Sequence, residues 1–232
     1  MNVVHRSIPN CFTSLNILAG TAAIICAVAG SEPMWGLKGY QWAYIFIGIA
    51  AVADFLDGFM ARVLHAYSDM GKELDSLCDL VSFGVAPAIV LYECLTESGA
   101  PVWVAWFALL IPLAGAMRLA KFNVDKRQLT SFIGLPIPGN AIFWIGFTSF
   151  VYAYGFPGIW ISLAVILAES WFMVGPVKMF SLKFRNLKWK ENRGRFLLIL
   201  VAAVLLVCMG LPGLMWLIVY YAVWGICMGD KV

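Results

Sequence analysis

Asp54-Phe55-Leu56-Asp57-Gly58-Phe59-Met60-Ala61-Arg62 and Gly71-Lys72-Glu73-Leu74-Asp75-Ser76-Leu77-Cys78-Asp79 place four aspartates within 26 residues of an otherwise apolar chain. Each stretch is continuous with a long apolar run, so the aspartates belong to segments that look embedded in a membrane. Charged side chains are costly in such segments and usually serve a function. The two stretches therefore indicate a pair of membrane helices that carry a functional site.

The rest of the chain agrees with a membrane location. It has 232 residues, of which 62% are hydrophobic and 12% are charged, a composition far more apolar than that of soluble domains. Alternating strand patterns are absent, which argues against a β-barrel. We expect an all-α polytopic membrane protein with one domain, 1–232, and about eight transmembrane helices, each of about 20 residues. The apolar stretches are 10–30, 39–64, 73–95, 101–122, 136–154, 157–179, 195–210 and 211–229.

The basic residues predict the orientation of these helices. With eight spans, only Lys38 of the 16 lysine and arginine residues falls on the side opposite to the others. The positive-inside rule makes the richer side cytoplasmic, so both termini are predicted to be cytoplasmic. Seven spans remain the alternative, because only Gly210-Leu211-Pro212-Gly213 separates the last two stretches. Seven spans would place Lys231 outside.

The first apolar stretch has a second interpretation. A basic start and Ala27-Val28-Ala29 resemble a signal peptide with its cleavage site. Polar or helix-starting residues at the front of the stretch (Pro9, Asn10, Thr13 and Asn16) favour a retained first helix instead.

Helical spacing brings the four aspartates together. Asp54 and Asp57 are three residues apart, and Asp75 and Asp79 are four apart, so each pair shares one helix face. The link from Arg62 to Gly71 is short, which predicts antiparallel neighbouring helices and a single cleft. Asp54 lies ~22 Å along its helix from position 39, which puts the cleft near the cytoplasmic boundary of a core of about 30 Å.

Bound cations are the simplest solution for four converging carboxylates. The four carboxylates repel one another, and only two basic residues, Arg62 and Lys72, are close to them in sequence. Oxygen ligands of this kind suit Mg²⁺ or Mn²⁺, and two such ions would bind a phosphate-bearing substrate. Two further acidic residues, Asp69 and Glu73, lie in or beside the loop between the two stretches, and we do not expect them to bind the cations. Gly58 and Ala61 leave room for a ligand beside the backbone, and Arg62 could bind a phosphate.

The eight spaced positions Asp54, Asp57, Gly58, Ala61, Arg62, Gly71, Asp75 and Asp79 resemble the signature of the CDP-alcohol phosphotransferase family. That resemblance implies transfer of a phosphoryl or phosphatidyl group from a CDP-activated donor to an alcohol, with release of CMP. It implies two divalent cations, one bound by Asp54, Asp57 and Asp75 and the other by Asp54, Asp75 and Asp79. It also implies Asp79 as general base, Gly58, Ala61, Arg62 and Gly71 around the CDP moiety, and a homodimer.

Further segments between residue 8 and about 140 resemble the phosphatidylserine synthase branch of that family. They are 8–16, 75–88, 118–123 and 132–138. This resemblance implies CDP-diacylglycerol and L-serine as substrates, a role in phospholipid biosynthesis, and an active site on the cytoplasmic side of the cell inner membrane. Lys121 stands where we expect an arginine, which changes the geometry available to a carboxylate.

Residues outside the signature are weaker candidates. Asn10 and Thr13 are expected near the nucleotide, or they only start the first helix. Ser82, Arg118, Lys121 and Asn123 are the candidates for acceptor binding, with helix packing or helix ends as the alternative for each. Glu169, inside the sixth span, bonds a neighbouring helix or captures an ammonium group.

Two other functions remain open. The same chemistry could use glycerol phosphate or an inositol compound as acceptor, and a cation transporter could use the aspartates as its ion site, although no matching set occurs in the second half of the chain. The basic stretch 178–195 is expected to contact anionic membrane lipids rather than nucleic acid.

Overall fold

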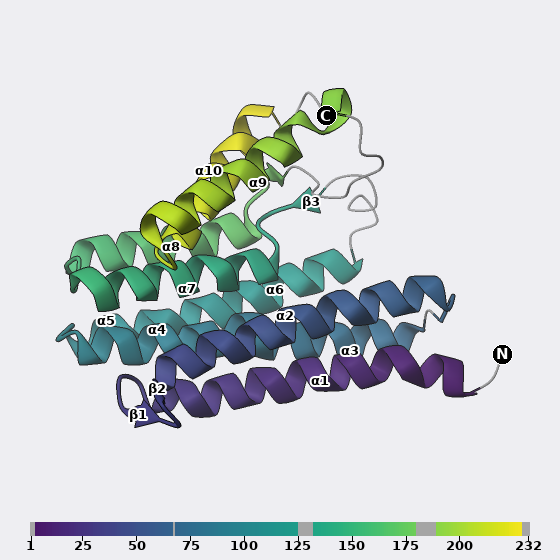
Figure 1. Cartoon of the computed structure of the whole chain (residues 1–232), viewed down its shortest axis with the longest axis horizontal. Helices are drawn as coiled ribbons and strands as arrows, with labels where there is room; N and C mark the ends of the chain where they lie inside the picture. Colours follow the sequence, from purple (N-terminus) through teal and green to yellow (C-terminus); the bar gives the residue numbers. More distant parts are fainter. Residues whose placement is uncertain (1–2, 67, 125–131, 180–188, 229–232) are drawn as a thin grey trace.

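The computed structural model describes residues 3–66, 68–124, 132–179 and 189–228, and these are overwhelmingly helical (Figure 1). Two antiparallel pairs of two-residue strands, not expected from the sequence, join loop segments. Strand β1 (Pro33–Met34) pairs with β2 (Leu37–Lys38), and β3 (Phe132–Ile133) pairs with β4 (Lys178–Met179). The predicted all-helical architecture is thus confirmed in its main features. The helices are α1 (Val3–Val28), α2 (Gly39–Val63), α3 (Asp69–Asp79), α4 (Ala86–Glu97), α5 (Val102–Ala105), α6 (Leu110–Val124), α7 (Ile137–Tyr154), α8 (Ile159–Val174), α9 (Trp189–Met209) and α10 (Gly213–Met228).

Two segments of other helix types continue the α-helices. A π-helix, η1 (Leu80–Val85), joins α3 to α4, and a 3₁₀ turn, η2 (Trp106–Leu109), joins α5 to α6. The third and fourth predicted spans are therefore continuous helical rods, 69–97 and 102–124, that change their winding along their length. A π-helical turn widens the helix and is often found at a functional site.

Five described helices are long and apolar enough to cross a membrane: Pro9–Val28, Gly39–Val63, Asp69–Glu97, Val102–Val124 and Asn192–Met209. Two shorter apolar helices cover Ile159–Val174 and Gly213–Ile226. The chain is therefore built for a membrane, and the count of eight spans stays a prediction. Several basic residues behind the orientation argument, among them Lys126, Arg127, Lys183 and Lys231, lie outside the described residues.

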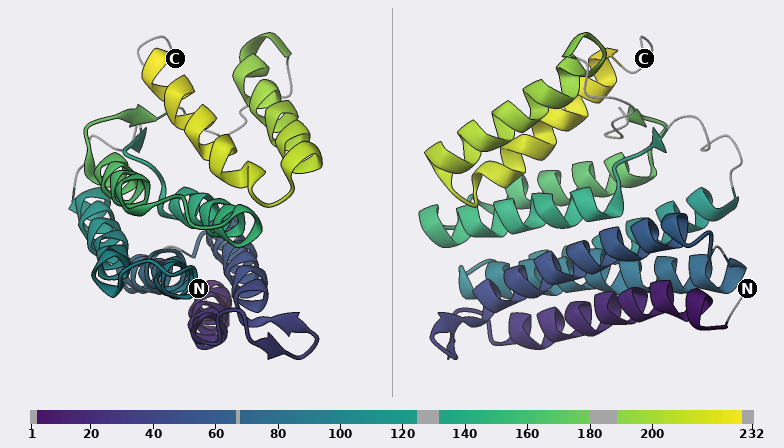
Figure 2. Two further views of the ribbon diagram at one scale, coloured as in Figure 1. Left: turned by 90° about the vertical axis from the view of Figure 1, so that its left-hand side faces the viewer. Right: turned by 45° about the vertical axis from the view of Figure 1, so that its right-hand side comes forward.

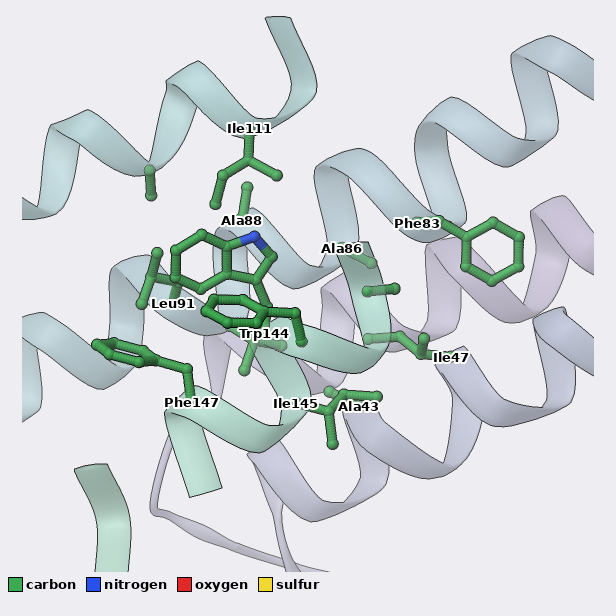
Figure 3. Packing of buried hydrophobic residues seen from close by; sticks show 14 of the residues in the cluster. Ala43, Ile47, Phe83, Ala86, Ala88, Leu91, Ile111, Trp144, Ile145 and Phe147 are labelled. Carbon is green, nitrogen blue, oxygen red and sulfur yellow. The ribbon is translucent and has the colours of Figure 1, made fainter. Parts of the chain in front are cut away.

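The core sits between the N-terminal helices and α7. Trp144 of α7 is fully buried, and Figure 3 shows its ring among Leu91, Ala88 and Ile111, with Phe147 beside it. The indole Nε1 of Trp144 donates to Asn140 Oδ1 at 2.7 Å, so the ring is buried without losing its hydrogen bond. This packing fixes α4 and α7 against each other.

The C-terminal pair, α9 and α10, crosses the remaining helices at an angle (Figures 1 and 2). Helix α10 packs on α7, whereas α9 contacts α10 and leaves most of its surface exposed. The N-terminal group, α1 to α4, lies on the opposite side of α7 and contains both aspartate stretches. The candidate site is therefore built by the first half of the chain.

Candidate active site

Asp54, Asp57 and Asp75 meet between α2 and α3. One carboxylate oxygen from each residue lies within 4.8 Å of the other two. Asp57 is buried, and Asp54 and Asp75 are half-buried. The structure thus brings together the three residues that the family resemblance assigns to a first metal ion, and their role as ligands stays a prediction.

Local structure explains why the two helices meet there. Asp57 lies six residues before the end of α2, and Asp75 lies six residues after the start of α3, about 9 Å along each helix. Ser68 caps α3, because its Oγ accepts a hydrogen bond from the Gly71 backbone N–H at 3.0 Å. A short link and a fixed helix start therefore place the aspartates at matching heights.

The carboxylates have unsatisfied oxygens. Asp57 Oδ2 and Asp75 Oδ1 are buried without a hydrogen-bond partner, and buried charged groups are costly unless they are paired. The two nearby basic residues bond elsewhere: Arg62 Nε donates to the Gly58 carbonyl at 2.8 Å, and Lys72 Nζ donates to the Asn123 carbonyl at 3.3 Å. An oxygen-only ligand set with unpaired charge fits a hard divalent cation.

Asp79 has a different environment from the other three aspartates. It is the last residue of α3, it is buried, and its Oδ1 accepts a hydrogen bond of 3.1 Å from Asn16 Nδ2 of α1. The three-carboxylate group does not include it. Asp79 therefore lies one helical turn beyond Asp75, held by α1.

A cavity of about 190 Å³ opens beside Asp57 and Asp75. Predicted nucleotide-binding residues from three different helices line it together: Asn10, Thr13, Gly58, Ala61 and Gly71. Arg62 does not line the cavity in this structure; its guanidinium lies along its own helix at the Gly58 carbonyl. The first apolar stretch thus contributes to the site as a helix, and the nucleotide role of these residues stays a prediction.

Gly58 and Gly71 shape this cavity differently. A Cβ added to Gly58 would meet no atom within 4 Å, so the space beside it is open to a ligand. A Cβ added to Gly71 would lie 2.9 Å from Ser68 Oγ and 3.5 Å from Asn10 Oδ1. Gly58 therefore leaves volume for the ligand, whereas Gly71 allows α1, α3 and the link between α2 and α3 to approach closely.

The acceptor candidates do not form one cluster. Ser82 is fully buried and its Oγ donates to the Asn16 carbonyl at 3.0 Å. Lys121 Nζ donates to the Val174 carbonyl at 3.1 Å, and Asn123 Nδ2 donates to Ser76 Oγ at 3.0 Å. Arg118 is buried, has an unpartnered Nε, and places its guanidinium 5.8 Å from the centre of the Phe122 ring. Arg118 is thus the candidate whose buried charge most needs a ligand.

Glu169 lies apart from the aspartates. It is buried on α8 beside an apolar cavity of about 160 Å³ that α10 helps to form, and its Oε1 has no hydrogen-bond partner. Among the described residues, Oε1 makes no bond to a neighbouring helix, and capture of an ammonium group by Glu169 stays a prediction.

Some site residues were missed by sequence reasoning. Ser68 and Ala66 line the cavity, and so does Lys72, which the sequence indicates only as a nearby basic residue. A serine three residues before Gly71 and followed by Asp69 is a typical helix start, and this signal could have identified Ser68. The sequence places Asn16 only among the polar or helix-starting residues of the first apolar stretch, and no local pattern links it to Asp79, 63 positions away.

Comparison with known proteins gives the family of this chain. The family model described as CDP-alcohol phosphatidyltransferase matches residues 6–175, which include most of α1, the signature and the helices up to α8. Among the relatives named CDP-diacylglycerol–serine O-phosphatidyltransferase, the protein of Methanocaldococcus jannaschii is 32% identical over 92% of this chain and 90% of its own length.

Two bacterial relatives with the same name match shorter parts. The Mycobacterium leprae protein is 37% identical over 72% of this chain, and the Bacillus subtilis protein is 44% identical over 46% of it. These matches cover 52% and 60% of the two relatives, so the chain spans little more than half of their length. The resemblance inferred from the signature is confirmed by the family model and by these relatives, and the chain belongs to the CDP-alcohol phosphatidyltransferase family.

Proposed function

We propose that this chain transfers the phosphatidyl group of CDP-diacylglycerol to the hydroxyl of L-serine, giving phosphatidylserine and CMP. One observation carries the proposal: three carboxylates from two helices, two of them with an unpartnered buried oxygen, face each other beside a cavity lined by the glycines of the family signature. The names of the relatives support serine as the acceptor.

The cavity suits the nucleotide end of the donor. Gly58 and Ala61 keep side chains out of its wall, and Asn10, Thr13 and Ser68 offer polar groups along it. Its position near the predicted cytoplasmic ends of α2 and α3 matches the depth at which the phosphates of a lipid meet its acyl chains. The diacylglycerol chains would then remain in the surrounding lipid.

Two divalent cations, Mg²⁺ or Mn²⁺, complete the proposed site. Asp54, Asp57 and Asp75 would hold one ion, and Asp54, Asp75 and Asp79 would hold the other. When bound, such ions neutralise the pyrophosphate of the donor and stabilise the departing CMP. The unpartnered oxygens of Asp57 and Asp75 support a cation at the first of these positions.

Asp79 is the proposed general base. It removes the proton of the serine hydroxyl as that oxygen forms its bond to the phosphorus of the diacylglycerol phosphate. The bond between this phosphorus and the oxygen bridging to CMP breaks, and CMP leaves. The number of bonds to phosphorus is conserved, and the proton remains on Asp79 until it passes to solvent.

Arg118 is the proposed partner of the serine carboxylate. A buried guanidinium with an unpartnered Nε has a donor available for a carboxylate. Ser82, Lys121 and Asn123 already donate to protein groups, so we place Arg118 first among the four acceptor candidates.

The surrounding architecture is part of the proposal. We place the active site at the cytoplasmic face of the cell inner membrane, with about eight spans in a single domain, both termini cytoplasmic, and two copies in a homodimer. Labelling with a membrane-impermeant reagent at cysteines introduced at Ser68 and at Trp35 tests the orientation, because reaction at Ser68 from the outside would reverse it.

The acceptor assay tests the function directly. Purified protein is supplied with CDP-diacylglycerol, Mn²⁺ or Mg²⁺, and L-serine, glycerol phosphate or inositol separately, and CMP release is measured. We expect serine alone to support release. Release with glycerol phosphate but not with serine would exclude the proposed acceptor, and cation flux in liposomes without any CMP release would favour a transporter.

A further inference from the structure

Asn16 of α1 contacts the catalytic segment in two ways. Its side-chain Nδ2 donates to Asp79 Oδ1 at 3.1 Å, and its backbone carbonyl accepts from Ser82 Oγ at 3.0 Å. Asn16 is fully buried, so neither contact competes with solvent. One residue of α1 is thus bonded both to the last residue of α3 and to the π-helix that follows it.

The approach of α1 to this segment depends on Gly20. A Cβ built on Gly20 would collide with Ser82 Oγ and with the Ser82 backbone. Gly20 and Asn16 are four residues apart and share one helix face. The close approach at Gly20 therefore brings the Asn16 amide within hydrogen-bond distance of Asp79.

The other side of the π-helix is also held. Asn140 Nδ2 of α7 donates to the Phe83 carbonyl at 2.9 Å, and Asn140 is fully buried. The backbone after Asp79 is thus fixed from α1 and from α7. The Asp79 carboxylate can still rotate about its own side-chain bonds when the backbone is fixed. Among the described residues, the Asn16 amide donates a hydrogen bond to this carboxylate.

Packing alone does not explain an asparagine at position 16. Its Oδ1 is buried and has no hydrogen-bond partner, and an unpaired buried acceptor destabilises a protein relative to an apolar side chain of similar size. The Nδ2 bond to Asp79 is the contact that an apolar side chain could not make. The residue is therefore better explained by what it does to Asp79 than by stability.

We propose that Asn16 is a positioning residue for Asp79: its amide holds Oδ1 and leaves Oδ2 directed at the hydroxyl that attacks. This inference rests on the proposed function, in which Asp79 removes a proton. Neither Asn16 nor Asp79 lines the cavity assigned to the nucleotide. Loss of the amide should therefore reduce turnover without weakening binding of the donor lipid.

Two variants of Asn16 and one control test this role. Asn16→Leu removes the polar amide at similar size, and Asn16→Asp keeps the shape but replaces the N–H donor by an acceptor. Thr21→Val is the matched control, because Thr21 is exposed on the same helix and bonds only to the Ile17 carbonyl. Each protein is assayed for kcat and for the KM of CDP-diacylglycerol, and its thermal midpoint is measured in detergent.

We expect both Asn16 variants to lose about 10- to 100-fold in kcat, the usual effect of removing a group that orients a catalytic ligand. The KM of CDP-diacylglycerol should stay within about 3-fold, which is below the tenfold that 1.4 kcal/mol produces. Asn16→Leu should keep the thermal midpoint of the wild type. Thr21→Val should keep both the kcat and the thermal midpoint of the wild type. A kcat of Asn16→Leu within about 2-fold of wild type, or a loss of kcat that only accompanies a lowered thermal midpoint, would overturn the positioning role.

The same assay separates this inference from the proposed function. If the wild type releases CMP with glycerol phosphate rather than with serine, the acceptor is wrong, and the Asn16 comparison is made with the acceptor that works. A normal kcat of both Asn16 variants with that acceptor overturns the positioning role alone. A wild type that releases no CMP with any acceptor overturns both.

Discussion

Asn140 Nδ2 donates a hydrogen bond of 2.9 Å to the backbone carbonyl of Phe83, inside the π-helix that follows Asp79. The same amide accepts at Oδ1 from the indole of Trp144 at 2.7 Å. The side chain that satisfies the π-helix thus also orients the largest residue of the core, so the shape of the site depends on α7.

Asn140→Leu should lower stability more than an average core substitution. It removes the side-chain donor to the Phe83 carbonyl and the acceptor of the Trp144 indole N–H, and an unsatisfied buried group costs about 1–3 kcal/mol. We expect a clear fall of the thermal midpoint in detergent. Ser162→Ala is the control, since Ser162 Oγ is buried without a partner and its removal should leave the midpoint unchanged. An unchanged midpoint for Asn140→Leu would show that the π-helix does not depend on this bond.

Asp75→Asn should reduce both metal binding and activity. It replaces one of the three oxygens that meet within 4.8 Å and halves the charge that this residue and Asp57 present to a cation. We expect Mn²⁺ to bind at least about 10-fold more weakly, and turnover to fall about 100-fold or more, as measured by Mn²⁺ titration and CMP release.

Asp69→Asn provides the matched control for the charge change. Asp69 is exposed in the first turn of the same helix and does not line the cavity. If both variants weakened Mn²⁺ binding equally, the effect would come from overall charge rather than from coordination.

Gly58→Ala should separate binding from stability. The added methyl group occupies open space in the cavity, so the KM of CDP-diacylglycerol should rise several-fold. In a helix interior, alanine is more stable than glycine by about 0.5–1 kcal/mol, so the thermal midpoint should not fall. Gly48→Ala, on the exposed face of the same helix, should gain the same stability with no change in KM. Equal KM values for the two variants would exclude Gly58 from the nucleotide site.

Arg118→Met should weaken serine binding selectively. Hydrogen bonds to charged groups contribute about 1.5–3 kcal/mol, so we expect the KM of serine to rise about 10-fold or more while that of CDP-diacylglycerol stays constant. Arg118→Lys should have a KM of serine between those of the wild type and Arg118→Met, because lysine keeps the charge but lacks the forked geometry of arginine. Arg193→Gln, at an exposed arginine of α9, is the control. A rise in the KM of both substrates would instead indicate a general disturbance of α6.

The sequence predicted the parts of the site that depend on spacing within a helix. Asp54 and Asp57 share a face because they are three residues apart, and the short link to Gly71 makes α2 and α3 neighbours. It could not predict pairings that depend on how distant helices pack. The bonds from Asn16 to Asp79 and from Asn140 to Phe83 join residues 63 and 57 positions apart, and neither leaves a local pattern.

The winding of the third span is a second feature that the sequence concealed. Leu80–Val85 continues the apolar run, so hydropathy alone predicts a regular α-helix, although Gly84 lies inside the segment and Pro87, which has no backbone N–H, follows it closely. The π-helix forms where Ser82 and the Phe83 carbonyl find partners on α1 and α7. Contacts with α1 and α7 therefore help to stabilise this local geometry.

The origin of the oxygen that links serine to phosphorus tests the central claim most directly. The protein is supplied with CDP-diacylglycerol, Mn²⁺ and L-serine whose hydroxyl carries ¹⁸O, and the lipid product and CMP are analysed by mass spectrometry. If the serine hydroxyl attacks the phosphorus beside the aspartate cluster, phosphatidylserine carries the label and CMP does not. Unlabelled phosphatidylserine, or CMP released without any serine-containing lipid, would contradict the proposed function.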